Sequence, residues 1–204
     1  MTDKSFLDLS GVTKRFPGVV ANDDVTFSIL PGEVHALFGE NGAGKSTLVK
    51  IIYGVQRPDE GEMRFDGKPY APAKPSEARA LGIGMVFQHF SLFEALTVAD
   101  NVALGMNKEA VGRHLDEQII EVSKAYGLTL DPARYIGSLS VGERQRVEII
   151  RCLLQKPRLL IMDEPTSVLT PQEVEILFQT LRQLSSEGCS ILYISHKLEE
   201  IREL

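Results

Sequence analysis

Apolar and polar residues alternate over short stretches in the first third of the chain. The alternation covers residues 6–9 and 25–29, and residues 34–38 form a compact apolar run. Short alternation is typical of half-buried strands, and an unbroken apolar run bounded by turns is typical of a buried strand. Pro31-Gly32 and Asp66-Gly67 are turn signals between such stretches. We therefore predict short strands here, including a buried strand at residues 34–38.

Helical patterns dominate from about residue 92 to residue 155, and residues 159–162 and 191–194 return to strand character. Between these two runs, a capping box and a first-position proline at residues 170–173 predict the start of an amphipathic helix. Gly188 stands where its C-terminal cap belongs. Strands separated by helices favour a mainly parallel α/β sheet. We expect an antiparallel β lobe near the N-terminus and a helical lobe in the middle of the chain.

The composition is that of an ordinary folded protein. Of 204 residues, 43% are hydrophobic and 25% are charged, and the formal net charge is −6. These values exclude a disordered or collagen-like chain and disfavour non-specific binding to nucleic acid or anionic lipid. No apolar run approaches the roughly 20 residues of a membrane-spanning helix. Cys152 and Cys189 match no metal-binding spacing, and we interpret them as reduced thiols of the core.

A glycine-rich octapeptide directly after the apolar run at residues 34–38 is the strongest motif. It matches G-x-x-x-x-G-K-[ST], the P-loop pattern, and a helical pattern follows it. In such a loop, backbone N–H groups surround phosphate oxygens, and the helix N-terminus adds positive potential. Lys45 is expected to reach the β and γ phosphates, and the Ser46 hydroxyl to bind Mg²⁺. The residues assigned to the nucleotide are Gly39, Glu40, Asn41, Gly42, Ala43, Gly44, Lys45, Ser46 and Thr47.

Two acidic residues end the apolar run at residues 159–162. Asp163 and Glu164 match the Walker B arrangement, in which the first acid holds Mg²⁺ and the second accepts a proton from the attacking water. An isolated acidic pair at a strand end is equally typical of a solvated turn. The P-loop upstream favours the catalytic interpretation.

Residues 139–146 begin a helix, with Ser140 and Glu143 in a capping box. A capped helix start is a structural feature in itself, and its N-terminus can also hold an anion. The segment resembles the LSGGQ signature of ABC-type ATPases, with Val141 and Glu143 in place of its first glycine and its glutamine. The resemblance implies that four residues face the γ-phosphate held by a second subunit: Ser140, Val141, Gly142 and Glu143.

The resemblance covers essentially the whole chain and implies further site residues. Gln88 matches the glutamine that touches Mg²⁺, His196 matches the histidine that contacts the γ-phosphate, and Phe16 matches the aromatic residue that stacks on adenine. The implied catalytic residues are Lys45, Gln88, Glu164 and His196. The implied Mg²⁺ ligands are Ser46, Gln88 and Asp163. The implied fold is a P-loop NTPase with a RecA-like, mainly parallel sheet, an antiparallel β lobe and a helical subdomain.

The chain is most similar to ATPases of bacterial importers for simple sugars and nucleosides, which carry two ATPase domains in one polypeptide. We expect residues 1–204 to be a single ABC-type ATPase domain, truncated at its C-terminus. Residues 1–88 and 156–204 are expected to form the nucleotide-binding core with the β lobe. Residues from about 89 to 155 are expected to form the helical subdomain. Thr170 stands where this family usually has an aspartate, and Val141 where it has a glycine.

The expected function is ATP hydrolysis coupled to uptake of a small solute, a nucleoside or a simple sugar. The expected partners are a second ABC ATPase domain (a tandem half or a dimer), membrane permease subunits and, indirectly, an external solute-binding protein, but no nucleic acid. The expected location is the cytoplasmic face of the membrane. A soluble ABC ATPase of DNA repair or translation is the alternative, although the chain shows neither a coiled-coil insertion nor basic stretches. A second alternative is a module that senses ATP without hydrolysing it. The presence of Lys45, Glu164 and His196 disfavours this alternative.

Overall fold

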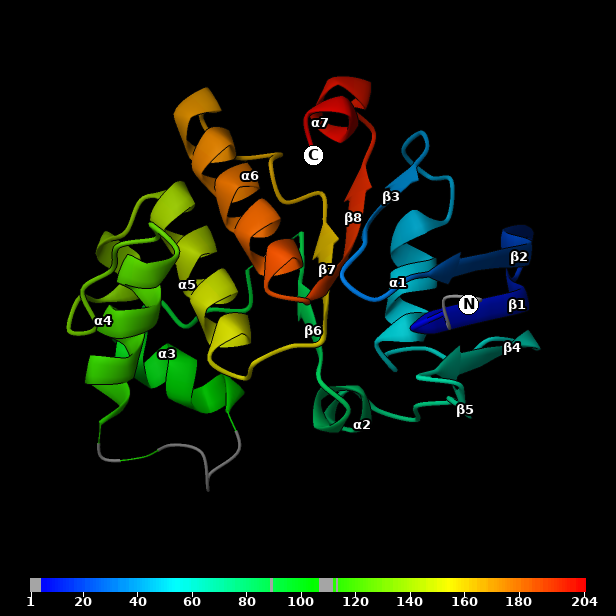
Figure 1. Cartoon of the computed structure of the whole chain (residues 1–204), viewed down its shortest axis with the longest axis horizontal. Helices are drawn as coiled ribbons and strands as arrows, with labels where there is room; N and C mark the ends of the chain where they lie inside the picture. The colour runs from blue at the N-terminus through cyan, green and yellow to red at the C-terminus, as the bar shows by residue number, and fades with distance from the viewer. Residues whose placement is uncertain (1–4, 89, 107–111, 113) are drawn as a thin grey trace.

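Two sheets and flanking helices make up the computed structural model, which describes residues 5–88, 90–106, 112 and 114–204 (Figure 1). The antiparallel sheet has the strand order β2-β1-β4-β5. Its strands are β1 (Leu7–Phe16), β2 (Val19–Ile29), β4 (Glu60–Phe65) and β5 (Lys68–Pro69). The predicted antiparallel lobe near the N-terminus is confirmed.

The second sheet is parallel and has the order β3-β8-β7-β6. Its strands are β3 (Val34–Phe38), β6 (Ile83–Val86), β7 (Leu159–Asp163) and β8 (Ser190–Ser195). Every residue of β7 and β8 is buried, because both strands lie inside the sheet with helices on either side. The mainly parallel α/β sheet is therefore confirmed, and the two acidic residues do stand at the end of a buried strand, Asp163 as its last residue and Glu164 directly after it.

The prediction of a buried strand at residues 34–38 is wrong in one respect. Strand β3 forms there, but its first four residues are only partly buried and Phe38 is 53% exposed. The reason is its place at the edge of the sheet, where it pairs with β8 alone among the described strands. A run of apolar residues does not distinguish an edge strand from a central one.

The helices divide between the two faces of the parallel sheet. Helix α1 (Lys45–Ile52) lies between the two sheets (Figure 1), where its apolar side joins a core cluster with β1, β4 and one face of the parallel sheet. On the other face, α5 (Val141–Leu153) and α6 (Pro171–Ser186) join a second cluster with α3 (Val98–Gly105) and α4 (Leu115–Ala125). A short 3₁₀ turn (Ile136–Ser138) precedes α5.

The predicted helix starts are confirmed at atomic detail. Thr170 accepts a hydrogen bond from the backbone of Glu173, whose carboxylate bonds back to Thr170, and Pro171 is the first residue of α6. Ser140 and Glu143 form the same box before α5. Gly188, at φ +94°, follows the C-cap of α6 as predicted.

Among the described elements that the pattern does not predict are β6, α2 (Pro75–Ala80) and α7 (Leu198–Glu203). Each has only four to six residues, too few for a clear periodicity. Both cysteines are free and buried, as expected of core thiols. None of the described helices combines the length and apolar character that crossing a bilayer requires.

Candidate functional site

The glycine-rich loop connects β3 to α1 and requires a glycine at its last position. Gly44 is the N-cap of α1 and has a positive φ of +81°. A Cβ atom added to Gly44 would lie 1.9 Å from the carbonyl oxygen of Ala21 in β2. Asn22 Nδ2 donates a hydrogen bond to the Gly44 carbonyl at 3.1 Å. The loop therefore packs directly on the backbone of the antiparallel sheet, at a distance that only glycine permits.

The side chain of Lys45 folds back onto the loop and bonds to its backbone. Its side chain is 7% exposed, and Nζ donates hydrogen bonds to the carbonyl oxygens of Gly39, at 2.6 Å, and Glu40, at 2.8 Å. Nζ also lies 3.8 Å from Oε1 of Glu164. A buried ammonium group thus lies at the start of α1, beside the backbone of the glycine-rich loop. This arrangement can hold a polyanion such as a nucleotide phosphate chain.

Ser46 and Asp163 bring hydroxyl and carboxylate oxygens together. Ser46 Oγ donates to Asp163 Oδ1 at 3.2 Å, and Asp163 is 3% exposed at the end of β7. Burial raises the pKa of Asp163 above its usual range, although the bond from Ser46 opposes the shift. No group of three or more His, Cys, Asp and Glu residues in the described part of the chain could hold a metal ion. One carboxylate and one hydroxyl suit Mg²⁺, which takes its other oxygens from phosphates and water.

Glu164 and His196 form a close pair beside the loop. Nδ1 of His196 lies 3.2 Å from Oε1 of Glu164, whose side chain is 12% exposed. Glu164 has a φ of +49°, a conformation that costs free energy in a residue with a side chain. Its backbone N–H donates to the carbonyl of Ile194 at 3.1 Å. The strained backbone and the pairing with a histidine are features of sites where a group must be held in one orientation.

A hollow of about 610 Å³ is lined by Lys45, Ser46 and Glu164, whereas Asp163 and His196 lie behind this lining, in contact with Ser46 and Glu164. Phe16, which is 41% exposed at the end of β1, lies at one side of it, and Gln88, which follows β6, also lines it. The hollow therefore brings together the aromatic residue, the loop and the acid that the sequence predicts for one site. Its lining residues are Phe16, Val19, Ala21, Asn41, Gly42, Ala43, Gly44, Lys45, Ser46, Thr47, Gln88 and Glu164.

The predicted signature residues do not line this hollow. Ser140 and Glu143 cap α5, and Glu143 also forms an ion pair with Arg134. The hydrogen bond from Ser140 N–H, together with Arg134, holds the pKa of Glu143 below its usual value. Gly142 packs against the carboxylate of Glu173, which would lie 1.8 Å from an added Cβ atom. Val141 is 45% exposed.

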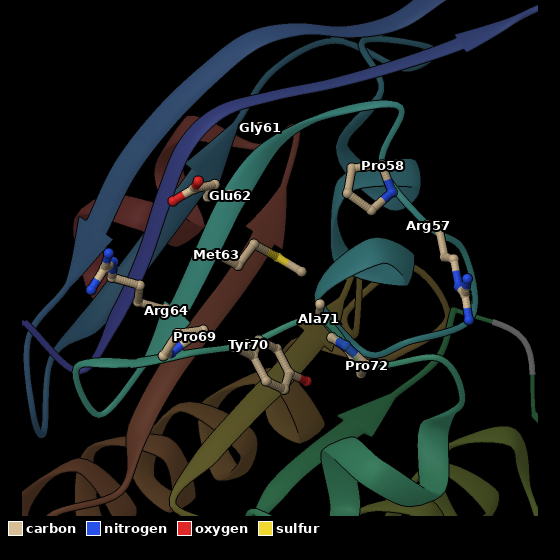
Figure 2. Close-up of a pocket in the computed structure, with 10 residues that line it drawn as sticks. All are labelled: Arg57, Pro58, Gly61, Glu62, Met63, Arg64, Pro69, Tyr70, Ala71 and Pro72. Atoms are coloured by element: carbon tan, nitrogen blue, oxygen red, sulfur yellow. The ribbon is translucent and has the colours of Figure 1, made fainter.

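A larger hollow, of about 690 Å³, lies beside β4 and β5 (Figure 2). Met63 and Tyr70 form its buried floor, and Figure 2 shows Arg57 and Arg64 on opposite sides of it. The Tyr70 hydroxyl already donates to the carbonyl of Ile52. Among the described residues, the lining contains one acid, Glu62, and no histidine or cysteine. Because it lacks a cluster of groups for acid–base or metal chemistry, the hollow at the glycine-rich loop is the better candidate site.

Sequence reasoning misses Asn22, which contacts the loop from β2. Its side chain is 6% exposed within a strand of alternating residues. A polar residue in an alternating strand suggests a solvent-facing position, so nothing in the local pattern marks this contact. The glycine at position 44, which the motif does mark, is the only local sign that another backbone approaches the loop.

Comparison with known proteins matches this geometry to a family. The family model described as ABC transporter matches residues 22–167. Ribose import ATP-binding protein RbsA 1 of Rubrobacter xylanophilus is 46% identical over 205 residues, which are 98% of this chain and 41% of the relative. Nucleoside import ATP-binding protein NupA of Lactococcus lactis subsp. cremoris is 48% identical over 207 residues, which are 99% of this chain and 41% of the relative. The chain thus spans less than half the length of these relatives.

Solved structures resemble the chain over almost its full length. A nucleotide-free ATP-binding cassette from an ABC transporter superposes with a TM-score of 0.87 at 27% identity, covering 98% of this chain and 84% of that one. The dimeric ABC transporter cassette MJ0796 superposes with a TM-score of 0.84 at 29% identity, covering 97% of this chain and 90% of that one. The fold is that of a P-loop NTPase, as the sequence predicts. By sequence and by structure, the chain belongs to the ABC transporter family.

Proposed function

We propose that this chain binds ATP at the glycine-rich loop and hydrolyses it to ADP and phosphate. The observation that carries the proposal is that Lys45, Ser46 and Glu164 line one hollow, with Asp163 in contact with Ser46 and His196 in contact with Glu164. The loop residues from Gly39 to Thr47 surround the phosphates with backbone N–H groups. Lys45 exchanges its carbonyl partners for phosphate oxygens. Phe16, exposed at the rim, stacks on the adenine.

Ser46, Asp163 and Gln88 are the proposed Mg²⁺ ligands. The hydrogen bond between Ser46 and Asp163 places two oxygen ligands side by side, and Gln88 lines the same hollow. When bound, the ion neutralises part of the negative charge that develops on the phosphates. The protein contributes the fixed positions of the ligands, because Asp163 ends a fully buried strand.

Glu164 is the proposed general base, and His196 is the residue that orients it. An attacking water gives a proton to the Glu164 carboxylate while its oxygen bonds to the γ-phosphorus and the ADP oxygen leaves. His196, whose Nδ1 lies 3.2 Å from the carboxylate, is also the proposed contact to the γ-phosphate. Lys45 Nζ lies 3.8 Å from the same oxygen of Glu164 and stabilises charge on the transferring group.

We infer further that a second ATPase domain completes the site. The residues of the signature, Ser140, Val141, Gly142 and Glu143, lie away from the hollow of their own chain. They begin α5, whose free N–H groups suit an anion presented by another molecule. The dimeric cassette among the similar structures supports this pairing.

In the proposed division, residues 1–88 and 156–204 are the nucleotide-binding core, and about 89–155 the helical subdomain. Residues 1–4, 89, 107–111 and 113 of this division lie outside the described residues.

The names of the relatives, a ribose and a nucleoside import ATP-binding protein, support a role in solute import. On that ground, the proposed cargo is a nucleoside or a simple sugar, carried by membrane permease subunits and supplied by an external solute-binding protein. The chain is then held at the cytoplasmic face of the membrane through the permease subunits.

A dilution series tests the shared site directly. If a second domain completes the site, phosphate release per molecule of protein rises with protein concentration at saturating MgATP. A turnover per molecule that stays constant across a hundredfold dilution contradicts the pairing. Absence of any phosphate release at the highest concentration contradicts hydrolysis itself.

A further inference from the structure

Glu200 is a carboxylate surrounded by hydrogen-bond donors. It lies in α7, is 8% exposed, and accepts bonds from Thr166 Oγ1 at 2.6 Å, Tyr193 Oη at 2.9 Å and Ser195 Oγ at 2.9 Å. Lys197 Nζ lies 2.9 Å from the same group. Two donors approach each oxygen, so the carboxylate is fully engaged.

The neighbours of Glu200 in the same helix behave differently. Glu199 and Glu203 are exposed, as acids in a short surface helix normally are. Burying a carboxylate is costly unless donors replace the lost water. Burial raises the pKa of Glu200, but the bonds from Thr166 and the other donors outweigh it and hold the pKa below its usual value. The site is therefore built for an ionised glutamate.

These donors come from the two segments that carry the reacting pair. Thr166 lies two residues after Glu164, in the turn that leaves β7. Ser195 ends β8 and directly precedes His196. One carboxylate thus joins the turn behind Glu164 to the strand end behind His196. Among the described residues, the backbone of Glu164 itself makes one hydrogen bond to the second segment, from its N–H to the carbonyl of Ile194.

The backbone conformation of Glu164 requires such a connection to hold it in place. A glutamate at φ +49° keeps that conformation only if the surrounding structure imposes it. The turn after Glu164 contains a weak backbone bond, from Ser167 N–H to the Glu164 carbonyl at 3.3 Å. The 2.6 Å bond from Thr166 to Glu200 is the shortest side-chain contact that anchors this turn.

We propose that Glu200 is a positioning residue: it holds the Glu164 turn against the His196 strand end and thereby sets the rate of hydrolysis, without contributing to ATP binding. This inference rests on the proposed function. Glu200 is not among the described residues that line the hollow, so its effect passes through the geometry of Glu164 and His196.

Thr166→Val and Tyr193→Phe form a matched pair that tests the proposal. Each variant removes one hydroxyl donor from Glu200 and leaves three donors in place. Only Thr166→Val disconnects the turn behind Glu164. Thr166→Val is expected to lower kcat roughly 10- to 100-fold, the range for a small misplacement of a catalytic group. KM for ATP and the melting temperature should stay close to those of Tyr193→Phe, whose kcat should match the wild type.

A second measurement separates positioning from general weakening of the fold. In a Glu164→Gln background, Thr166→Val should cost nothing further, because residues that act through one group are non-additive. Equal losses of kcat in Thr166→Val and Tyr193→Phe, or an undiminished loss in the Glu164→Gln background, overturn the inference. Wild-type kcat in Thr166→Val also overturns it while leaving the proposed function intact. A wild-type protein that does not hydrolyse ATP overturns the proposed function itself.

Discussion

The Ser46 hydroxyl donates a hydrogen bond to the Asp163 carboxylate at 3.2 Å, across a sequence separation of 117 residues. Ser46 lies in the first turn of α1 and Asp163 ends β7, so the fold brings them together at the carboxyl ends of parallel strands. Ligands bind at this edge in open α/β sheets. The pair supplies two oxygen atoms at the position where the phosphate chain is proposed to lie.

This pair predicts that Asp163→Asn removes the dependence of nucleotide binding on Mg²⁺. The wild-type protein should bind ATP more tightly with Mg²⁺ than with a chelator, because the carboxylate is a stronger ligand than an amide oxygen. The variant should bind equally in both conditions, as measured by titration with a fluorescent ATP analogue. A variant that retains the full Mg²⁺ effect would show that Asp163 is not a ligand.

Gly44→Ala should destabilise the protein more than Gly42→Ala. Both positions have positive φ, so each alanine costs about 1–2 kcal/mol of backbone strain. Only Gly44 adds a collision, because its Cβ would lie 1.9 Å from the Ala21 carbonyl, whereas nothing lies within 4 Å of a Cβ at Gly42. Urea unfolding of the two variants measures the difference, and equal midpoints would contradict the close packing of loop and sheet.

The cap of α5 predicts a pH-dependent stability. Because the hydrogen bond from Ser140 N–H lowers the pKa of Glu143 in the folded state, its ionisation stabilises the fold at neutral pH. This contribution is complete above the unfolded pKa, about 4.3, and is lost as the pH falls through the lower folded value. Glu143→Gln should therefore cost roughly 0.5–1 kcal/mol at pH 7 and nothing at the acid end. A cost that does not change with pH would exclude this origin.

Several parts of this account are visible in the sequence because their signals are local. The cap of α6 needs only Thr170 and Glu173, three residues apart, and both take the predicted roles. The glycine-rich loop carries its whole pattern within residues 39–46, and the structure places it between β3 and α1 as expected.

Other parts depend on contacts that no local pattern encodes. Residues 34–38 are apolar enough for a central strand, and only the strand order reveals that β3 lies at an edge. Glu200 follows Glu199 in a short segment rich in charged residues, which is typical of a solvated helix, yet it is buried and accepts a hydrogen bond from Thr166, 34 residues earlier. The contact of Asn22 cannot be predicted from its local sequence for the same reason, since its partner Gly44 is 22 residues away.

Glu164→Gln is expected to separate binding from hydrolysis. The amide keeps the shape of the side chain but cannot accept the proton of the attacking water. Loss of a general base costs about 10²–10⁴-fold in rate. ATP affinity should persist, because Lys45, Ser46 and Asp163 are unchanged. Single-turnover hydrolysis and nucleotide retention check the two halves of the prediction. Wild-type turnover would assign the base to another group, and lost binding would make Glu164 a binding residue.

ATP affinity measured with and without the Lys45 ammonium tests the central claim most directly. Calorimetric titration of MgATP is compared for the wild type, Lys45→Ala and Lys124→Ala, which removes the same charge from an exposed position on α4. Charge-assisted hydrogen bonds of about 1.5–3 kcal/mol correspond to a loss of roughly tenfold or more in affinity. The account predicts this loss for Lys45→Ala and unchanged binding for Lys124→Ala. Equal affinity in all three proteins would contradict ATP binding at this loop.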